Sequence, residues 1–523
     1  MGVVNIKAFE KATLVNRKEL FRLGTAVLFI VGIMMFAIMR GEGGQHSALL
    51  VIAAMIGGYM AINIGANDVA NNLGPAVGSE AITLAGALLI AAIFEASGAL
   101  IAGGDVVSTI KGGIINPDLI GDADTFIWLM LAALLAAALW LNFATAVGAP
   151  VSTTHSIVGG VLGAGVAAGG WAIADWSVVA QIAASWVISP VMGGVIAALF
   201  LYIVKRTVTY KTNVLAAARV VVPRLVALMA WAFATYLMLK GVKQIVHVSF
   251  LTAMIVGFAV AIAVYLIVKP YVHRATIDLP DSKDSVNDLF TVPLIFAAAL
   301  LSFAHGANDV ANAVSPLAGI YDAIVSGDLH SNTTIPLWVM LIGALGIALG
   351  LALYGPKLIR TVGSEITELD RTRAFCTAMA AAITVIIASQ LGLPVSSTHI
   401  AVGGVFGVGF LREYIKVNYS RMIEEIKLHH INDSPEEVEA FLIRFEAATV
   451  RERGVMLREL KKRAKKTRLL RKGEHKRLRK IHKLELVKRS LLFRIAAAWI
   501  VTVPVAGLVA AGIFFMIRGV MLP

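Results

Sequence analysis

Two aspartates, Asp68 and Asp309, lie within the same seven-residue sequence, Gly-Ala-Asn-Asp-Val-Ala-Asn, at 65–71 and again at 306–312. Each copy follows a long apolar stretch. A carboxylate is costly there, and membrane proteins keep intramembrane acids mainly to bind or move ions. The simpler alternative is that the amides only bond to one another between helices. A duplicated carboxylate exceeds what packing needs, so we predict a cation site with four flanking amides: Asn67, Asn71, Asn308 and Asn312.

A second motif, Pro-Val-Ser-x-Thr-His, occurs at 150–155 and at 394–399. Proline followed by hydroxyl residues is typical of the first turn of a helix, where side-chain oxygens and backbone N–H groups converge at the positive end of the helix dipole. N-capping alone would explain one hydroxyl. Three hydroxyls in each copy predict an anion site made of Ser152, Thr153, Thr154, Ser396, Ser397 and Thr398, supported from behind by His155 and His399 as packing residues.

The distribution of charge links the two motifs. Between residues 47 and 204 the only lysine or arginine is Lys111, so basic side chains that could neutralise a bound anion are scarce. An anion held near two carboxylates would be repelled unless cations lay between them. The sequence therefore predicts that anion binding is coupled to Na⁺ or H⁺, as in a symporter.

The motif pairs belong to a longer internal repeat. The first motif recurs after 241 residues (306 minus 65) and the second after 244 (394 minus 150). A weaker match relates 190–194 to 504–507 with a shift of 314, so the second half carries about 70 additional residues (314 minus 244). Glycines and prolines surround both aspartates, as Gly65 and Pro75 or Gly306 and Pro316, which predicts that the helix breaks at each aspartate.

Composition places the repeats in a bilayer. The 523 residues are 58% hydrophobic and 15% charged, with a mean hydropathy of +0.80. A span needs about 20 apolar residues, and such runs are found near 23–39, 47–64, 81–103, 125–147, 176–204, 221–239, 248–269, 288–305, 335–355, 374–391 and 491–518. The segments 152–170 and 396–410 could be further spans or re-entrant hairpins. We expect an all-α polytopic membrane protein with about 11–12 spans.

Six segments follow from these boundaries. They are a basic N-terminal segment with the first span (1–46), the first repeat (47–204), linking spans (205–287), the second repeat (288–411), a basic insertion (412–490) and a final span that completes the second repeat (491–523). The insertion has 23 Lys and Arg against 12 Asp and Glu, which favours the cytoplasmic side, and Ser434-Pro435-Glu436-Glu437 predicts the start of a helix within it. Its basic run lacks the aromatics of a nucleic-acid surface. Contact with anionic lipid or an acidic regulatory partner fits the run better than nucleic acid does, and a solvated charged arm fits it best.

The two motifs in this order resemble the inorganic phosphate transporter family, often called PiT, over nearly the whole chain apart from the first helix and the insertion. The resemblance implies inverted repeats, a homodimer in a bacterial or archaeal inner membrane, and import of phosphate with Na⁺, or with H⁺ and metal phosphate. It implies that cation coupling involves Asp68, Asp309, Asn67, Asn308 and Glu95. Where sodium is the coupling ion, Asp68 and Asp309 are the implied Na⁺ ligands. The amides and hydroxyls implied to hold phosphate are Asn67, Asn71, Ser152, Thr153, Thr154, Asn308, Asn312, Ser396, Ser397 and Thr398.

Other functions fit the sequence less well. An intramembrane protease would need a catalytic set such as His-Glu-x-x-His, which is absent, so we expect no enzyme and no organic cofactor. Sulfate is the alternative substrate, because some members that resemble this chain carry it. Animal members also have an acid before the second hydroxyl motif, whereas 375–391 has none, so the cation stoichiometry stays open.

Overall fold

The computed structural model describes residues 6–40, 47–147, 151–242, 246, 248–326, 335–365, 369–429 and 489–522, with a few single residues and short pieces between 439 and 459. Within this part, the chain is helical and its elements contain no strand. The helices are α1 (Ile6–Arg40), α2 (Ser47–Asn67), α3 (Val69–Gly78), α4 (Leu84–Ala102), α5 (Gly104–Gly112), α6 (Ala123–Ala146), α7 (Thr153–Gly169), α8 (Trp176–Val204), α9 (Val214–Lys240), α10 (Phe250–Ala275), α11 (Lys283–Leu289), α12 (Thr291–Ser326), α13 (Leu337–Glu365), α14 (Arg371–Gln390), α15 (Ser397–His429) and α19 (Arg489–Met521).

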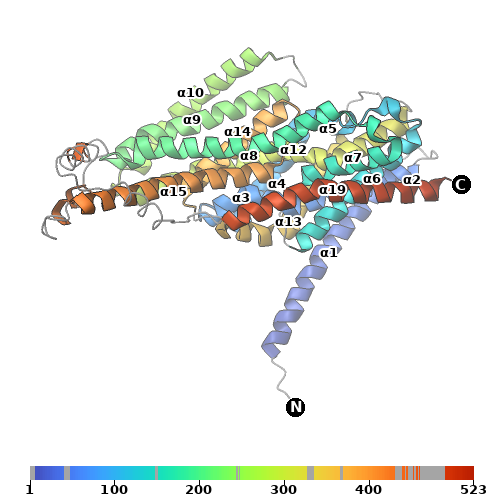
Figure 1. Cartoon of the computed structure of the whole chain (residues 1–523), viewed down its shortest axis with the longest axis horizontal. Coiled ribbons are helices and arrows are strands. Elements are labelled where there is room, and N and C mark those ends of the chain that lie inside the picture. The colour runs from blue at the N-terminus through green and yellow to red at the C-terminus, as the bar shows by residue number, and fades with distance from the viewer. Residues whose placement is uncertain are drawn as a thin grey trace.

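Eleven segments of the described chain are long and apolar enough to span a bilayer, which confirms the expected number. Long helices suit this setting because a helix satisfies its own backbone polar groups where water is absent. Most of the spans form one elongated bundle, from which α1 diverges on one side, while α9 and α10 pack together on the opposite side (Figure 1).

The helix starts follow from local sequence. Asp122, Asp175 and Asp370 each accept a backbone N–H from the first turn of the helix that follows, and Ser249 does the same for α10. Such caps satisfy donors that have no partner within the helix. The helices α6 and α7 form one packed pair and α14 and α15 another, with a hydroxyl motif in the turn of each pair.

The two copies of the repeat pack in matched ways. The α2 helix of the first copy packs against α13 of the second, and α12 of the second packs against α4 of the first. In the same manner α7 packs against α19 and α15 against α8. Each repeat therefore supplies partners for the other, and the weak match between 190–194 and 504–507 corresponds to equivalent helices.

The structure corrects the expected break at Asp309, because α12 runs without interruption from Thr291 to Ser326. At Asp68 the irregularity is slight, since its backbone stays helical and its N–H still donates to Ile64 O at 2.9 Å. The glycines serve packing instead. A Cβ at Gly65 would lie 1.9 Å from Ile347 O, and one at Gly306 would lie 2.1 Å from Glu95 O. Small residues at these points let membrane helices approach closely.

The basic insertion begins as the last part of α15, which extends to His429. Its most basic run, residues 461–483, lies outside the described residues. The predicted helical character of that run and its cytoplasmic placement therefore stay predictions.

Candidate binding site for an anion and cations

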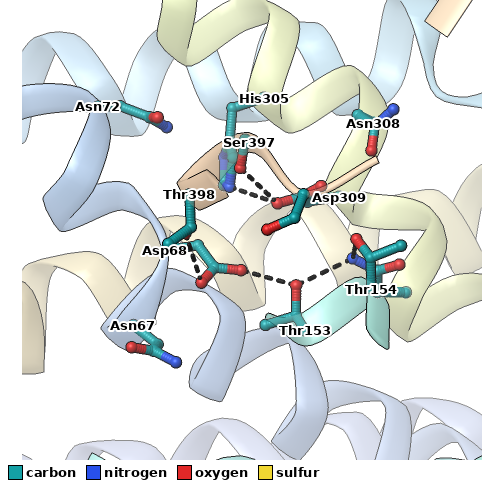
Figure 2. A network of polar contacts seen from close by, with 12 residues as sticks. Asn67, Asp68, Asn72, Thr153, Thr154, His305, Asn308, Asp309, Ser397 and Thr398 are labelled. Atoms are coloured by element: carbon teal, nitrogen blue, oxygen red, sulfur yellow. Dashed lines mark hydrogen bonds and ion pairs between the residues drawn. The ribbon is translucent and has the colours of Figure 1, made fainter. Parts of the chain in front are cut away.

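The two hydroxyl motifs meet the two aspartates in one buried cluster. Ser152 caps α7 by accepting the His155 N–H at 3.2 Å, and Ser396 accepts the His399 N–H at 3.3 Å at the start of α15. Both helices thus begin inside the protein, next to the junction of α2 and α3 and next to α12, where the aspartate motifs lie (Figure 2). Their first turns present N–H groups that have no acceptor within the helix.

Asp68 is 2% exposed. Within the described residues, the side chains that donate hydrogen bonds to its carboxylate are both hydroxyls. Thr153 Oγ1 donates to Asp68 Oδ2 at 2.6 Å, and Thr398 Oγ1 donates to Oδ1 at 3.2 Å (Figure 2). One hydroxyl comes from each repeat. Asp68 therefore joins the two helix starts.

Asp309 is equally buried but has a different set of neighbours. Ser397 Oγ donates to Asp309 Oδ2 at 3.0 Å, as Thr153 does to Asp68. The same oxygen lies 2.7 Å from Nε2 of His305, one helical turn earlier on α12 (Figure 2). One half of the site therefore has an imidazole against its carboxylate.

The amides of the aspartate motifs tie the cluster to the hydroxyl motifs. Asn312 Nδ2 donates to Oγ1 of Thr153 at 3.0 Å and of Thr154 at 3.2 Å. Asn67 donates to Val151 O at 3.4 Å. The side chain of Asn71 lies outside the described residues, so its predicted role stays a prediction.

The amide of Asn308 has hydrogen-bond partners for both its nitrogen and its oxygen in one of its two orientations. In that orientation the nitrogen donates to Val395 O and to Asp309 Oδ1, each at 3.0 Å, and the oxygen accepts from Ser389 Oγ at 3.2 Å. The contact with Val395 O matches that of Asn67 with Val151 O in the other repeat. Both amides therefore brace the backbone directly before the first serine of a hydroxyl motif.

Glu95 reaches the cluster through a residue that the motif analysis missed. Its carboxylate is fully buried, with Oε2 2.5 Å from His305 Nδ1 and Oε1 accepting from Asn72 Nδ2 at 3.3 Å. His305 directly precedes the second seven-residue motif, and Asn72 directly follows the first. Comparing the residues that border the two copies would have identified both.

The predicted supporting histidines lie behind the helix starts. The His155 ring contacts the Trp186 ring in a tilted arrangement, with ring centroids 3.8 Å apart, and meets the His399 ring edge-on at 4.6 Å. The His399 ring stacks on Trp499 at 3.6 Å. These aromatic contacts pack the two hydroxyl-motif helices against each other and against α8 and α19.

The arrangement combines groups for both signs of charge. Hydroxyls and helix N-termini suit an anion, while carboxylate oxygens suit a cation. Asp68, Asp309 and His305 can each offer a ligand atom within 4.8 Å of the others. Among the described residues, the hydrogen bonds and the ion pair given above for this cluster involve no lysine or arginine.

Comparison with known proteins gives a consistent result. A model of the phosphate transporter family matches residues 64–510. The chain is 52% identical, over 98% of its length and of theirs, to proteins named "Putative phosphate permease" from Helicobacter pylori strains J99 and 26695. It is 38% identical to a protein of the same description from Thermococcus kodakarensis, over 71% of this chain and 90% of that protein.

A solved structure named "The sodium-dependent phosphate transporter" has the same fold. It superposes with a TM-score of 0.74 at 30% identity and covers 91% of this chain and 100% of the solved chain.

Proposed function

Because the chain belongs to the phosphate transporter family, we propose that it is a secondary active symporter that imports inorganic phosphate coupled to Na⁺. The observation that carries this proposal is the junction of two buried carboxylates with two hydroxyl-bearing helix starts. Phosphate would bind the amides and hydroxyls, and Na⁺ would bind Asp68 and Asp309. The residues assigned to phosphate are Asn67, Asn71, Ser152, Thr153, Thr154, Asn308, Asn312, Ser396, Ser397 and Thr398.

Electrostatics explains why phosphate and Na⁺ should be transported together. Phosphate brought beside Asp68 and Asp309 adds negative charge to a site where both carboxylates are at most 2% exposed. Burial strengthens that repulsion because little water screens it. A cation between carboxylate and phosphate removes the repulsion, so each solute should raise the affinity for the other, and the coupling is reciprocal. The family relative named as sodium-dependent supports Na⁺ as the cation.

Uptake of labelled phosphate by proteoliposomes tests the proposal. An inward Na⁺ gradient should drive accumulation above equilibrium, whereas equal Na⁺ on both sides should allow only equilibration. A proton gradient without Na⁺ is the matched comparison, because accumulation there would assign the coupling to H⁺. Unlabelled sulfate at a hundredfold excess should compete poorly, and strong competition would assign the site to the alternative substrate, sulfate.

The proposal also covers the membrane in which the protein lies, its oligomeric state and the side of the membrane on which the insertion lies. We propose that it lies in the cell inner membrane as a homodimer, with the insertion on the cytoplasmic side and its basic run against anionic lipid or an acidic partner. Cysteine labelling of the insertion in intact cells and in opened cells tests its side.

A further inference from the structure

The matched packing of the repeats identifies which residues occupy equivalent places. Gly65 lies against Ile347 O and Gly306 against Glu95 O, and these glycines differ by 241 residues. Ile347 is therefore the counterpart of Glu95, with a shift of 252 (347 minus 95). A second pair of close approaches gives the same shift, because Gly98 lies against Phe303 O and Gly350 against Ile62 O.

The same sequence shifts show that the two repeats differ in the residues beside their aspartates. With the shift of 241, Ile64 is the counterpart of His305, and Ala313 is the counterpart of Asn72. Ile64 and Ile347 are fully buried, as are His305 and Glu95. The polar chain Asn72–Glu95–His305 that reaches Asp309 is thus replaced on the side of Asp68 by alanine and two isoleucines.

This asymmetry is informative because buried polar groups are expensive. Desolvating a carboxylate and an imidazole costs more than burying aliphatic side chains, and apolar replacements of buried ion pairs are often neutral or stabilising. The molecule itself shows that Ile64 and Ile347 fit the equivalent helix packing. Packing therefore does not require Glu95 and His305, so their presence calls for another reason.

The contacts indicate what that reason is. His305 is hydrogen-bonded at Nδ1 to Glu95 Oε2 at 2.5 Å, and its Nε2 lies 2.7 Å from Asp309 Oδ2 as an ion-pair contact. A planar ring anchored by Glu95 and in contact with Asp309 is limited in how far it can turn away from that carboxylate. The donors on Asp68 are hydroxyls, which rotate and can offer lone pairs to a cation that Asp68 also binds.

We propose that Glu95 and His305 are positioning residues that hold Asp309 as a fixed part of the phosphate site, which leaves Asp68 as the carboxylate that takes up and releases the coupling cation. The two aspartates then differ in role although their motifs are identical. Asp68 responds to Na⁺ with its two hydroxyl partners. Asp309 fixes the start of α15 through the hydrogen bond that it accepts from Ser397, so that the N–H groups of that first turn are held toward phosphate. The assignment rests on the proposed coupling to Na⁺ and narrows it, because of the two carboxylates only Asp68 then exchanges the cation.

Equilibrium binding of labelled phosphate to the purified full-length protein, measured over a range of Na⁺, separates these roles. In Asp68→Asn, phosphate affinity should become insensitive to Na⁺. In Asp309→Asn, phosphate affinity should fall at least tenfold at saturating Na⁺, while the half-saturating Na⁺ concentration stays within threefold of wild type. Equal loss of Na⁺ stimulation in both variants would overturn the assignment.

A double-mutant cycle tests the positioning role. His305→Ile should weaken phosphate binding about as much as Asp309→Asn, and should add less than twofold in the Asp309→Asn background, because it acts through that carboxylate. In the Asp68→Asn background its effect should appear in full. Glu95→Gln, which keeps an acceptor for the ring, should bind phosphate within threefold of wild type, unlike Glu95→Ile. A full additional loss in Asp309→Asn would contradict the proposal.

Folding is checked with a variant that copies the other repeat, Asn72→Ala/Glu95→Ile/His305→Ile, whose melting temperature should equal or exceed that of wild type. Ile64→Val and Ile347→Val are matched controls and should bind phosphate and Na⁺ as wild type does. If the phosphate affinity of the wild-type protein does not depend on Na⁺ concentration, the proposed coupling to Na⁺ is wrong. The cycle on phosphate affinity still decides whether His305 acts through Asp309, so the two failures are distinguishable.

Discussion

The half of the site around Asp68 and the half around Asp309 share a scaffold and differ in chemistry. Both have a glycine in close helix contact and a hydroxyl of the facing motif bonded to the carboxylate. Only the Asp309 half adds Glu95 and His305. Duplication thus preserved the helix geometry, which packing constrains strongly, while the residues bordering the motif diverged. Roles in such a protein are therefore better sought where the copies differ than where they agree.

Removing one of the two carboxylates at a time should have the largest effect on transport and so tests the comparison of the two halves most directly. Asp68→Asn and Asp309→Asn should each abolish Na⁺-driven accumulation of phosphate in proteoliposomes, because net transport needs both the cation and a correctly formed anion site. The amount of protein recovered in the membrane serves as the control. Accumulation near the wild-type level by either variant would remove that aspartate from the transport cycle.

The hydroxyls that face the carboxylates give the next largest effect. Thr153→Val and Ser397→Ala each remove a hydrogen bond to a carboxylate, at 2.6 Å and 3.0 Å respectively. Hydrogen bonds to charged groups contribute about 1.5–3 kcal/mol. If these hydroxyls turn to phosphate when it binds, as the proposed function requires, their loss should lower apparent phosphate affinity by roughly one to two orders of magnitude. Similar losses would show that both halves hold phosphate. No change in the half-saturating phosphate concentration would limit these hydroxyls to bracing the aspartates.

The capping serines should have smaller effects. Ser152 and Ser396 accept backbone N–H groups of their own helices at 3.2 Å and 3.3 Å. Replacing a serine N-cap by alanine costs about 1 kcal/mol. Ser152→Ala and Ser396→Ala should therefore lower the melting temperature in detergent by a few degrees. If they also weaken phosphate binding by tenfold or more, the serines bind the anion in addition to capping.

Much of the architecture could be predicted from the sequence, since apolar length and repeat spacing report directly on spans and on equivalent helices. The repeated motifs also predicted both aspartates and the hydroxyls that face them. A break was expected at Asp309 because Gly306 and Pro316 lie near it, whereas Gly306 allows close contact with α4. His305 does not stand out in the motifs, because residues that are identical in the two copies do not reveal positions at which the copies differ. Which side chains meet across helices depends on tertiary packing that spacing alone does not encode.

Deleting the basic insertion should have the smallest effect on binding. The first repeat has no equivalent of these roughly 70 residues (314 minus 244), and the relative from Thermococcus kodakarensis matches over 90% of its own length but only 71% of this chain. Replacing residues 430–488 by a flexible linker, which keeps the described parts of α15 and α19, should leave phosphate affinity within twofold. Dependence of uptake on anionic lipid should weaken, because the removed run 461–466 is the part that we propose attracts such lipid. A matched variant that keeps the segment but replaces Lys461, Lys462, Arg463, Lys465 and Lys466 by glutamine isolates the effect of charge. Loss of phosphate binding in a folded, membrane-inserted linker variant would place the insertion in the transport machinery, and the second repeat would then differ from the first in more than the environment of its aspartate.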